Sequence, residues 1–68
     1  MTKIYNNVYA LRTKAGITQE NLCKKIGISR QTLSKIENGA YNPTLSLAFT
    51  IAKFFEKPIE KVFSPKRF

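Results

Sequence analysis

The sequence predicts an all-α domain of five helices, and three features of the chain lead to this expectation. Apolar residues recur three or four positions apart over most of the 68 residues, which is the spacing of one face of a helix. Ser, Thr or Asn precedes most of these segments, and Gly or Pro follows them, as at helix starts and stops. A hydrophobic content of 43% suffices for one small core. We therefore expect a single domain over residues 1–68 with its core in about residues 6–63.

The first helix is expected to begin at Asn6 or Asn7 and to reach about Ala15, where Gly16 stops it. The residues ahead of it, Met1–Tyr5, alternate polar with β-prone side chains. They form either a frayed end or a small strand, so the expected domain is helical apart from this end.

The second and third helices are expected to be short and joined by a tight turn that contains Gly27. Thr18 can cap the second helix and Ser29 the third, because a hydroxyl oxygen accepts a free amide N–H of the first turn. Gly39 ends the third helix, because helices commonly end with a residue in the left-handed conformation and glycine adopts it readily. Apolar residues mark the buried face of the pair: Leu22, Ile26, Ile28, Leu33 and Ile36. This arrangement is a helix-turn-helix.

The outward face of the third helix is polar and carries residues of the kind that bind nucleic acid. Arg, Gln and Lys side chains can bind base edges or phosphates, and hydroxyls can bind phosphates. The residues left on this face are Arg30, Gln31, Thr32, Ser34 and Lys35. The pattern predicts that this helix reads bases, although an ordinary solvated helix face can carry the same residues.

The fourth helix is expected from a Thr44 cap to about Phe55, after Pro43 ends the preceding loop. Its apolar residues lie on several sides, so it should be buried on more than one face. Pro58 can occupy the first turn of a short fifth helix, Ile59 to about Phe63.

The charge of the chain favours a polyanionic partner. Twelve Lys and Arg residues face four acidic residues, which gives a formal net charge of +8 and a pI near 10.0. So large an excess on so small a domain favours nucleic acid ahead of an anionic membrane surface. Charge alone would also fit a merely soluble basic protein, but charge together with a helix-turn-helix makes that interpretation weaker.

Cys23 is the single cysteine and cannot form a disulfide within the chain. Its place beside Leu22 favours a small buried core residue over a redox-sensing thiol, since reactive thiols need exposure. The first residues contain no apolar run of the kind found in a cleavable leader, and no stretch approaches the length of a membrane span. We expect a cytoplasmic protein.

Taken together, these segments resemble the Cro/CI-type, lambda-repressor-like family of DNA-binding domains. The likeness rests on the segments ITQENL, IGISRQTL, IENG and NPTL, which begin at Ile17, Ile26, Ile36 and Asn42. Within that family the chain is most similar to the short stand-alone bacterial repressors of the cytolysin-repressor type. This resemblance implies five helices, a homodimer on palindromic double-stranded DNA, and a small two-stranded sheet formed by the two chain ends.

The resemblance also implies roles for residues around the third helix. Gln19 lies where family members bind a phosphate, although it could be a simple exposed residue of the first turn. Arg30 and Gln31 open the base-reading helix, and Lys35 one turn on would reach guanine or phosphate. Tyr41 is either a backbone contact or a lid over the core edge. The complete set expected at DNA is Gln19, Ser29, Arg30, Gln31, Thr32, Ser34, Lys35, Asn38, Tyr41 and Asn42, of which Asn42 could instead be only a turn residue.

Arg12 and Glu37 form a structural ion pair by the same resemblance. The family places an Arg of the first helix against a Glu at the end of the third, partly buried. The pair would explain an acidic residue so close to a DNA-facing surface, and it keeps Arg12 out of the DNA set.

The residues after the fourth helix supply the expected dimer interface. Ile59, Val62 and Phe63 are apolar, and one small core cannot easily cover all five Phe residues of the chain. A two-fold dimer would let each subunit read one half of a palindrome. The alternative is that Ile59 and Phe63 complete the core of the single chain.

The most favoured function is therefore sequence-specific binding of double-stranded DNA by a homodimer that represses a nearby promoter. The alternative is an antitoxin-like or other protein-interaction module with the same fold. RNA binding is possible from charge alone, but the third helix lacks exposed stacking aromatics. With no His, no Cys pair and no Gly-rich phosphate loop, an enzyme is disfavoured, and we expect no cofactor, metal or small-molecule ligand.

Overall fold

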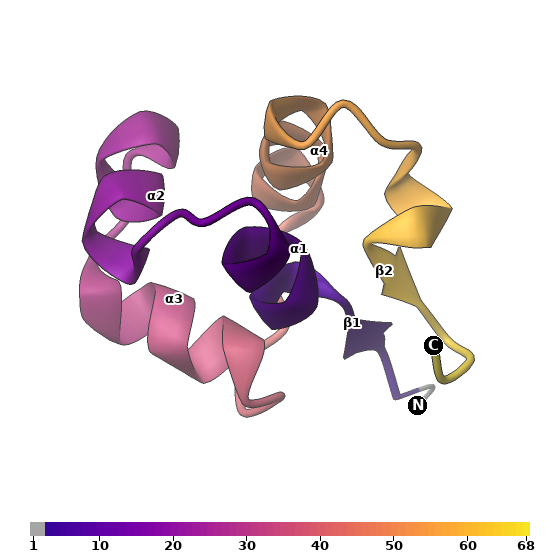
Figure 1. Cartoon of the computed structure of the whole chain (residues 1–68). Coiled ribbons are helices and arrows are strands. Elements are labelled where there is room, and N and C mark those ends of the chain that lie inside the picture. The colour runs from indigo at the N-terminus through magenta and orange to yellow at the C-terminus, as the bar shows by residue number, and fades with distance from the viewer. Residues whose placement is uncertain (1–2) are drawn as a thin grey trace.

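Helices dominate the computed structural model, which describes residues 3–68 (Figure 1). The elements in chain order are β1 (Tyr5–Asn6), α1 (Val8–Lys14), α2 (Gln19–Ile26), α3 (Arg30–Glu37), α4 (Leu45–Phe54), the 3₁₀ helix η1 (Ile59–Lys61) and β2 (Phe63–Ser64). In Figure 1, α2 and α3 lie together at one end of the molecule and the two strands lie at the other, with α1 and α4 between them. Within residues 3–68, no helix is long and apolar enough to cross a membrane.

The helices begin and end close to the residues expected from the sequence. The Thr18, Ser29 and Thr44 hydroxyls each accept the amide N–H three residues on, at 3.1, 3.1 and 3.2 Å. Each bond satisfies one amide that the first turn of a helix leaves without a partner. Gly27 follows α2 in the left-handed region, at φ 76°, where the absence of a Cβ avoids a steric cost.

The two chain ends form the small antiparallel sheet that the family resemblance implies. Tyr5 is opposite Ser64 and Asn6 is opposite Phe63. The amide of Asn7 extends the pairing by donating to the carbonyl of Val62 at 2.9 Å. The part of the expected strand at residues 1–2 lies outside the described residues.

The fifth α-helix predicted from Ile59 to about Phe63 is wrong. The segment is a single 3₁₀ turn that ends at Lys61, and Phe63 belongs to β2. The physical reason is competition for backbone hydrogen bonds, because the carbonyl of Val62 and the backbone of Phe63 are used in the sheet. The described fold is therefore four α-helices, one 3₁₀ turn and a two-stranded sheet.

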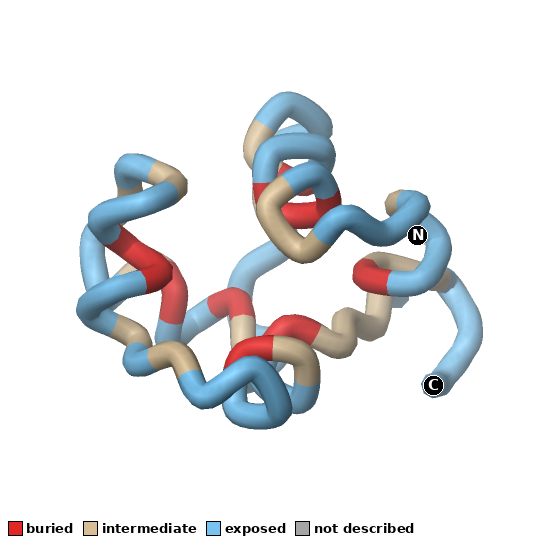
Figure 2. Tube along the Cα trace, turned by 45° about the horizontal axis from the view of Figure 1, so that its top comes forward, coloured by how far each residue is buried: buried red, intermediate tan, exposed pale blue. Residues whose placement is uncertain are grey.

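The core lies where α1, α2, α3 and α4 face one another, as the buried positions in Figure 2 indicate. It includes Leu22, Leu33 and Ile36, all three without exposed surface, as the helical spacing predicted. Cys23 is 5% exposed and belongs to the same cluster, in agreement with its interpretation as a small core residue. Burial raises the pKa of its thiol, so the thiol stays protonated rather than becoming a reactive thiolate.

The expectation that α4 is buried on more than one face holds for the side of Leu47 and Phe54, which pack against the core, and is wrong for the side of Leu45 and Phe49. Ala48, Ile51 and Ala52 are buried, but Leu45 is 71% exposed and Phe49 is 53% exposed. These last two residues are one helical turn apart, so they form an apolar strip on the outer side of α4. No other element within residues 3–68 covers this strip.

Candidate nucleic-acid interface

The helix α3 presents a row of polar side chains to solvent while its opposite face is fixed in the core. Arg30, Gln31, Ser34 and Lys35 are exposed, whereas the intervening Leu33 has no exposed surface. The face predicted to read bases is therefore accessible over two turns of the helix. Its Arg and Gln lie in the first turn, the part of a recognition helix that comes closest to base edges.

Ser29 and Thr32 are engaged with each other at the start of α3. Besides accepting the amide of Thr32, the Ser29 hydroxyl donates to the Thr32 hydroxyl oxygen at 2.9 Å. The hydroxyl proton of Thr32 is therefore available to donate to an acceptor such as a phosphate oxygen. Because Ser29 precedes the helix and Thr32 is half-buried, both lie at the edge of the polar row rather than at its centre.

The turn before α3 sets the angle at which the polar row is presented. The amides of Gly27 and Ile28 both donate to the carbonyl of Cys23, at 2.8 and 3.2 Å. Two bonds to one carbonyl close the C-terminus of α2 and direct the chain into Ser29. The side chain of Ile28 packs against the core, so the turn is anchored on its inner side.

The expected ion pair between Arg12 and Glu37 is present and is largely buried. The guanidinium donates from Nε to Glu37 Oε2 at 2.6 Å and from Nη2 to Oε1 at 3.2 Å. The side chains are 11% and 6% exposed. This hydrogen bonding raises the pKa of Arg12 above its ordinary value, so the guanidinium stays charged. A third bond, from Nη1 to the carbonyl of Ile17 at 2.9 Å, ties α1 to the loop before α2.

Gln19 belongs to this buried network, which its sequence position did not reveal. Its Nε2 donates to Glu37 Oε1 at 3.0 Å, and the residue is half-buried. A carboxamide nitrogen carries two protons, so one is left to donate outward. Glu37 therefore joins α1, α2 and α3 through one carboxylate, and it orients Gln19 as well as neutralising Arg12.

The loop after α3 is exposed. Asn38 caps the helix, and its Oδ1 accepts the amide of Ala40 at 3.0 Å. Tyr41 is 41% exposed and lies outside the core cluster, which counts against its interpretation as a lid. Asn42 is exposed and borders a hollow that it shares with Pro43 and Leu45.

The three residues predicted at the dimer interface differ in burial. Ile59 and Phe63 are half-buried and pack against the core, yet both also line the hollow beside Leu45. Val62 has no exposed surface, so its assignment to the interface is corrected to the core of the single chain. Sequence reasoning missed Leu45, because periodicity alone does not tell which apolar side of α4 the chain itself covers.

We call this hollow the α4–β2 groove. It has a volume of about 390 Å³. Apolar side chains form most of its lining: Ile4, Pro43, Leu45, Ala48, Ile59, Phe63 and Pro65. The groove and the outer strip of α4 together form the apolar surface that the described part of the chain leaves open to solvent beside its sheet.

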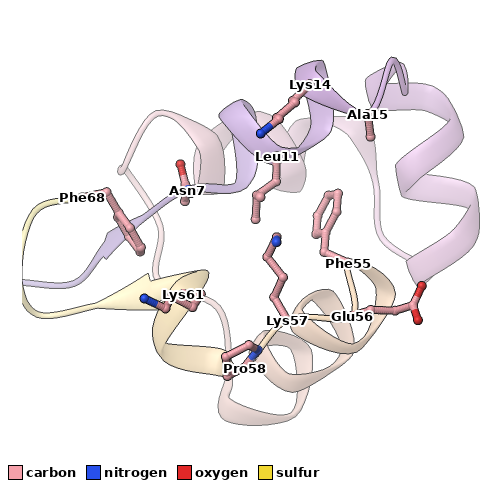
Figure 3. A pocket seen from close by; sticks show the side chains of 10 residues that line it. All are labelled: Asn7, Leu11, Lys14, Ala15, Phe55, Glu56, Lys57, Pro58, Lys61 and Phe68. Carbon is pink, nitrogen blue, oxygen red and sulfur yellow. The ribbon is translucent and has the colours of Figure 1, made fainter.

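A second hollow, of about 700 Å³, lies between α1 and the segment after α4 (Figure 3). Leu11 and Phe55 point into it, and three lysines line it: Lys14, Lys57 and Lys61. It contains no residue of α2, α3 or the loop after α3, so it is separate from every residue predicted to contact DNA.

The positive charge of the chain is not concentrated at the predicted DNA contacts. Residues 19–42, which include that whole set, hold four of the twelve basic and two of the four acidic residues. This segment therefore has a formal net charge of +2 and the remainder of the chain has +6; without the buried Arg12–Glu37 pair, which joins the two parts, the values are +3 and +5. The overall charge predicted a polyanionic partner but does not by itself identify the contacting face.

The comparisons with known proteins agree with this geometry. A family model described as helix-turn-helix matches residues 8–62. The HTH-type transcriptional regulator MJ0272 of Methanocaldococcus jannaschii is 52% identical over 58 residues, which cover 85% of this chain and 88% of that protein. YgzD of Bacillus subtilis, another HTH-type regulator, is 45% identical with the same coverage of both chains. The relatives are thus archaeal as well as bacterial, which is wider than the bacterial origin implied by the resemblance.

Two further matches are of structural and functional interest. Antitoxin HipB of Escherichia coli is 40% identical over 55 residues, which cover 81% of this chain and 62% of that protein. The restriction-modification controller protein C.AhdI of Aeromonas hydrophila superposes with a TM-score of 0.74 at 25% identity, over 81% of this chain and 83% of that one. These relatives are regulators, an antitoxin and a controller protein rather than enzymes, as the sequence predicted.

Proposed function

Because the chain belongs to the helix-turn-helix family of DNA-binding transcriptional regulators, we propose that it binds a specific double-stranded DNA sequence as a homodimer and represses a nearby promoter. The observation that carries the proposal is the exposed polar row of α3, with Arg30 and Gln31 in its first turn. A guanidinium can donate two bonds to guanine and a carboxamide can pair with adenine. A dimer bound across a promoter excludes polymerase sterically, so binding itself would repress.

Backbone contacts would come from both sides of α3. On one side, Gln19 has a carboxamide proton free for a phosphate beside the N-terminus of α2. On the other, the exposed side chains of Asn38, Tyr41 and Asn42 can donate to the sugar-phosphate backbone. Contacts of this kind fix the register of the protein on the duplex, and the bases are then read by α3.

The dimer is proposed to form through the α4–β2 groove and the outer strip of α4. Leu45 and Phe49 expose large apolar side chains there, and Ile59 and Phe63 line the groove beside Leu45. A small domain gains stability by covering such a surface with a second copy. A two-fold axis through this surface would place two copies of α3 on the same duplex.

The proposal is tested by selecting duplexes that the full chain retains from a random library. We expect an inverted repeat whose half-sites lie about 34 Å apart, or roughly ten base pairs centre to centre, because two recognition helices then enter successive major grooves on one side of the duplex. Insertion of about half a helical turn between the halves should abolish tight binding. Enrichment of a site without an inverted repeat, or equal binding after the insertion, would contradict the symmetric dimer.

The interface gives a separate prediction for Leu45→Glu. A carboxylate on the outer strip of α4 should prevent dimer formation without unfolding the chain, since Leu45 is 71% exposed in the single chain. Sedimentation at concentrations on the order of ten micromolar should find wild type dimeric and the variant monomeric. Thr50→Glu is the matched control, because Thr50 is exposed on the same helix but turned away from Leu45. A monomeric wild type would count against the interface.

Lys35 is expected to affect the salt dependence of binding. If its ammonium neutralises a phosphate in each subunit, Lys35→Ala should flatten the slope of log K against log salt by up to about two units. Gln31→Ala is the control, because a carboxamide neutralises no charge and should leave the slope unchanged. If Lys35 reads guanine instead, its removal should relax sequence preference at a symmetric pair of positions.

A protein-interaction role is the second candidate, and the relation to antitoxin HipB favours it. In that case the α4–β2 groove would bind a different protein rather than a second copy of the chain. Co-purification of a second protein in constant proportion, lost in Leu45→Glu, would favour this role. Tight binding of a selected duplex by the purified chain alone would favour the first.

A further inference from the structure

One of the last backbone carbonyls of α3 has a partner that is distant in the sequence. The last carbonyls of a helix lack partners within the helix and must be satisfied from elsewhere. The residues that directly follow α3 satisfy most of them: the carbonyl of Ser34 accepts from Asn38, and that of Lys35 accepts from Ala40 and Tyr41. The carbonyl of Ile36 accepts from Gly39 at 3.1 Å and, at 2.8 Å, from the side chain of Asn6, thirty residues away.

The side chain of Asn6 makes bonds at both of its polar atoms. Nδ2 donates to the carbonyl of Ile36, and Oδ1 accepts the amide of Val8 at 3.1 Å, at the start of α1. The second bond fixes the rotation of the carboxamide, so its nitrogen is directed at α3. The residue is half-buried, which strengthens both bonds relative to an exposed position.

The backbone of Asn6 is held by a different part of the chain. Asn6 lies in β1 opposite Phe63 of β2, and the next amide, that of Asn7, donates to the carbonyl of Val62. Val62 has no exposed surface, so β2 is anchored in the core at this point. Asn6 therefore connects the terminal sheet to the C-terminus of α3 by a route that does not pass through α2 or the turn at Gly27.

We propose that Asn6 is a positioning residue for base reading: its bond to Ile36 holds the C-terminal end of α3 at the angle that lets the polar row reach the base edges. The inference rests on the proposed reading of bases by α3. The N-terminal end of α3 is set by the turn at Gly27, and at its C-terminal end Arg12 and Gln19 hold the side chain of Glu37. The bond from Asn6 adds a support to the backbone of that end from the terminal sheet, which restricts the direction of the helix axis further.

Loss of this support should reduce discrimination more than overall affinity. Bidentate bonds to bases require an orientation held to about 10–20°, whereas flexible lysines follow a phosphate over a wider range. A small tilt of α3 would therefore weaken binding to the selected duplex and leave binding to a scrambled duplex nearly unchanged. A residue that only stabilised the fold would affect the two duplexes alike in the folded protein.

The test compares Asn6→Ser with Asn7→Ser in the full chain. A serine at position 6 can still accept the amide of Val8, but it is too short to reach Ile36. Asn7 is the matched control, because it is adjacent and its side chain makes no capping bond to α1. The measured quantity is the ratio of Kd for scrambled duplex to Kd for selected duplex, at one salt concentration and below the unfolding transition.

We expect Asn6→Ser to lower this ratio about tenfold or more and Asn7→Ser to change it by less than about twofold. Equal ratios in Asn6→Ser and wild type would overturn the positioning role. If Asn6→Ser does not fold, the carboxamide signal of Asn6 in wild type is followed by NMR. It should shift on addition of the selected duplex and not the scrambled one, and an unmoved signal would likewise overturn the role.

The proposed function has its own control in this experiment. An Arg30→Ala, Gln31→Ala variant should lose discrimination if α3 reads bases, whatever Asn6 does. If the Arg30→Ala, Gln31→Ala variant loses discrimination while Asn6→Ser keeps the wild-type ratio of Kd values, only the positioning role of Asn6 is rejected. Retention of discrimination in that variant would reject base reading by this face, and the role of Asn6 with it.

Discussion

Replacing Glu37 by alanine is expected to destabilise the domain by about 3–5 kcal/mol. The substitution leaves the guanidinium of Arg12 without its anion, in a residue that is only 9% exposed. It also removes the acceptor of Gln19 Nε2. Domains of this size have roughly 3–10 kcal/mol of stability in total, so the variant should lose a large share of it.

Urea or thermal unfolding followed by circular dichroism measures this loss. Glu20→Ala is the control, because its pair with Lys24 is 3.5 Å long and its side chain is 63% exposed. Breaking such an exposed pair should cost about 0.5 kcal/mol or less. A loss below about 1 kcal/mol for Glu37→Ala would mean that water replaces the carboxylate and that the network does not hold the three helices together.

Replacing Arg30 and Gln31 together by alanine is expected to abolish the preference for the selected duplex. Each bidentate pairing contributes about 1–3 kcal/mol of discrimination, and a dimer makes each pairing twice. Gln31→Ala alone should weaken specific binding by about 1–3 kcal/mol and relax the preference at one position of each half-site. Both side chains are exposed, so the fold should be unaffected.

Competition between selected and scrambled duplexes at constant salt measures the preference, and circular dichroism of the same samples checks the fold. Lys24→Ala, Lys25→Ala is the matched control, since it also removes exposed long side chains but from α2. Only general affinity should fall in the control. Full discrimination by the Arg30→Ala, Gln31→Ala variant would show that another surface reads the sequence.

Local signals in the sequence predicted the helices and the position of the polar row. A hydroxyl before each of α2, α3 and α4 and a glycine after α2 act within one turn, so the residues concerned are neighbours in the sequence. The same local reasoning misjudged the segment after Pro58. Whether Phe63 continues a helix or enters a strand depends on Asn6 and Asn7, which are distant in the sequence but adjacent in the fold.

The connections that orient the candidate site were only partly predictable. The Arg12–Glu37 pair was expected from the family resemblance, and its geometry is as expected. The bonds from Gln19 to Glu37 and from Asn6 to Ile36 were not predicted, because carboxamides occur widely on surfaces and in turns and carry no spacing signal. The exposure of Leu45 was missed for a similar reason, since burial depends on what the rest of the chain covers.

The uneven charge of the molecule has a consequence for how a duplex is first captured. Most of the net charge lies outside residues 19–42, and the molecule measures 31 × 22 × 19 Å. At physiological salt, charges act over about 8 Å, so the three lysines of the hollow in Figure 3, which is separate from the predicted DNA contacts, attract a duplex that approaches them and add little to one seated on α3. Collisions captured by these lysines would therefore begin in an orientation that does not bring α3 to the bases. The protein would then be held loosely on the DNA and would have to rotate before α3 meets the bases. Short-range hydrogen bonds from α3, rather than long-range electrostatic attraction, would fix the final orientation.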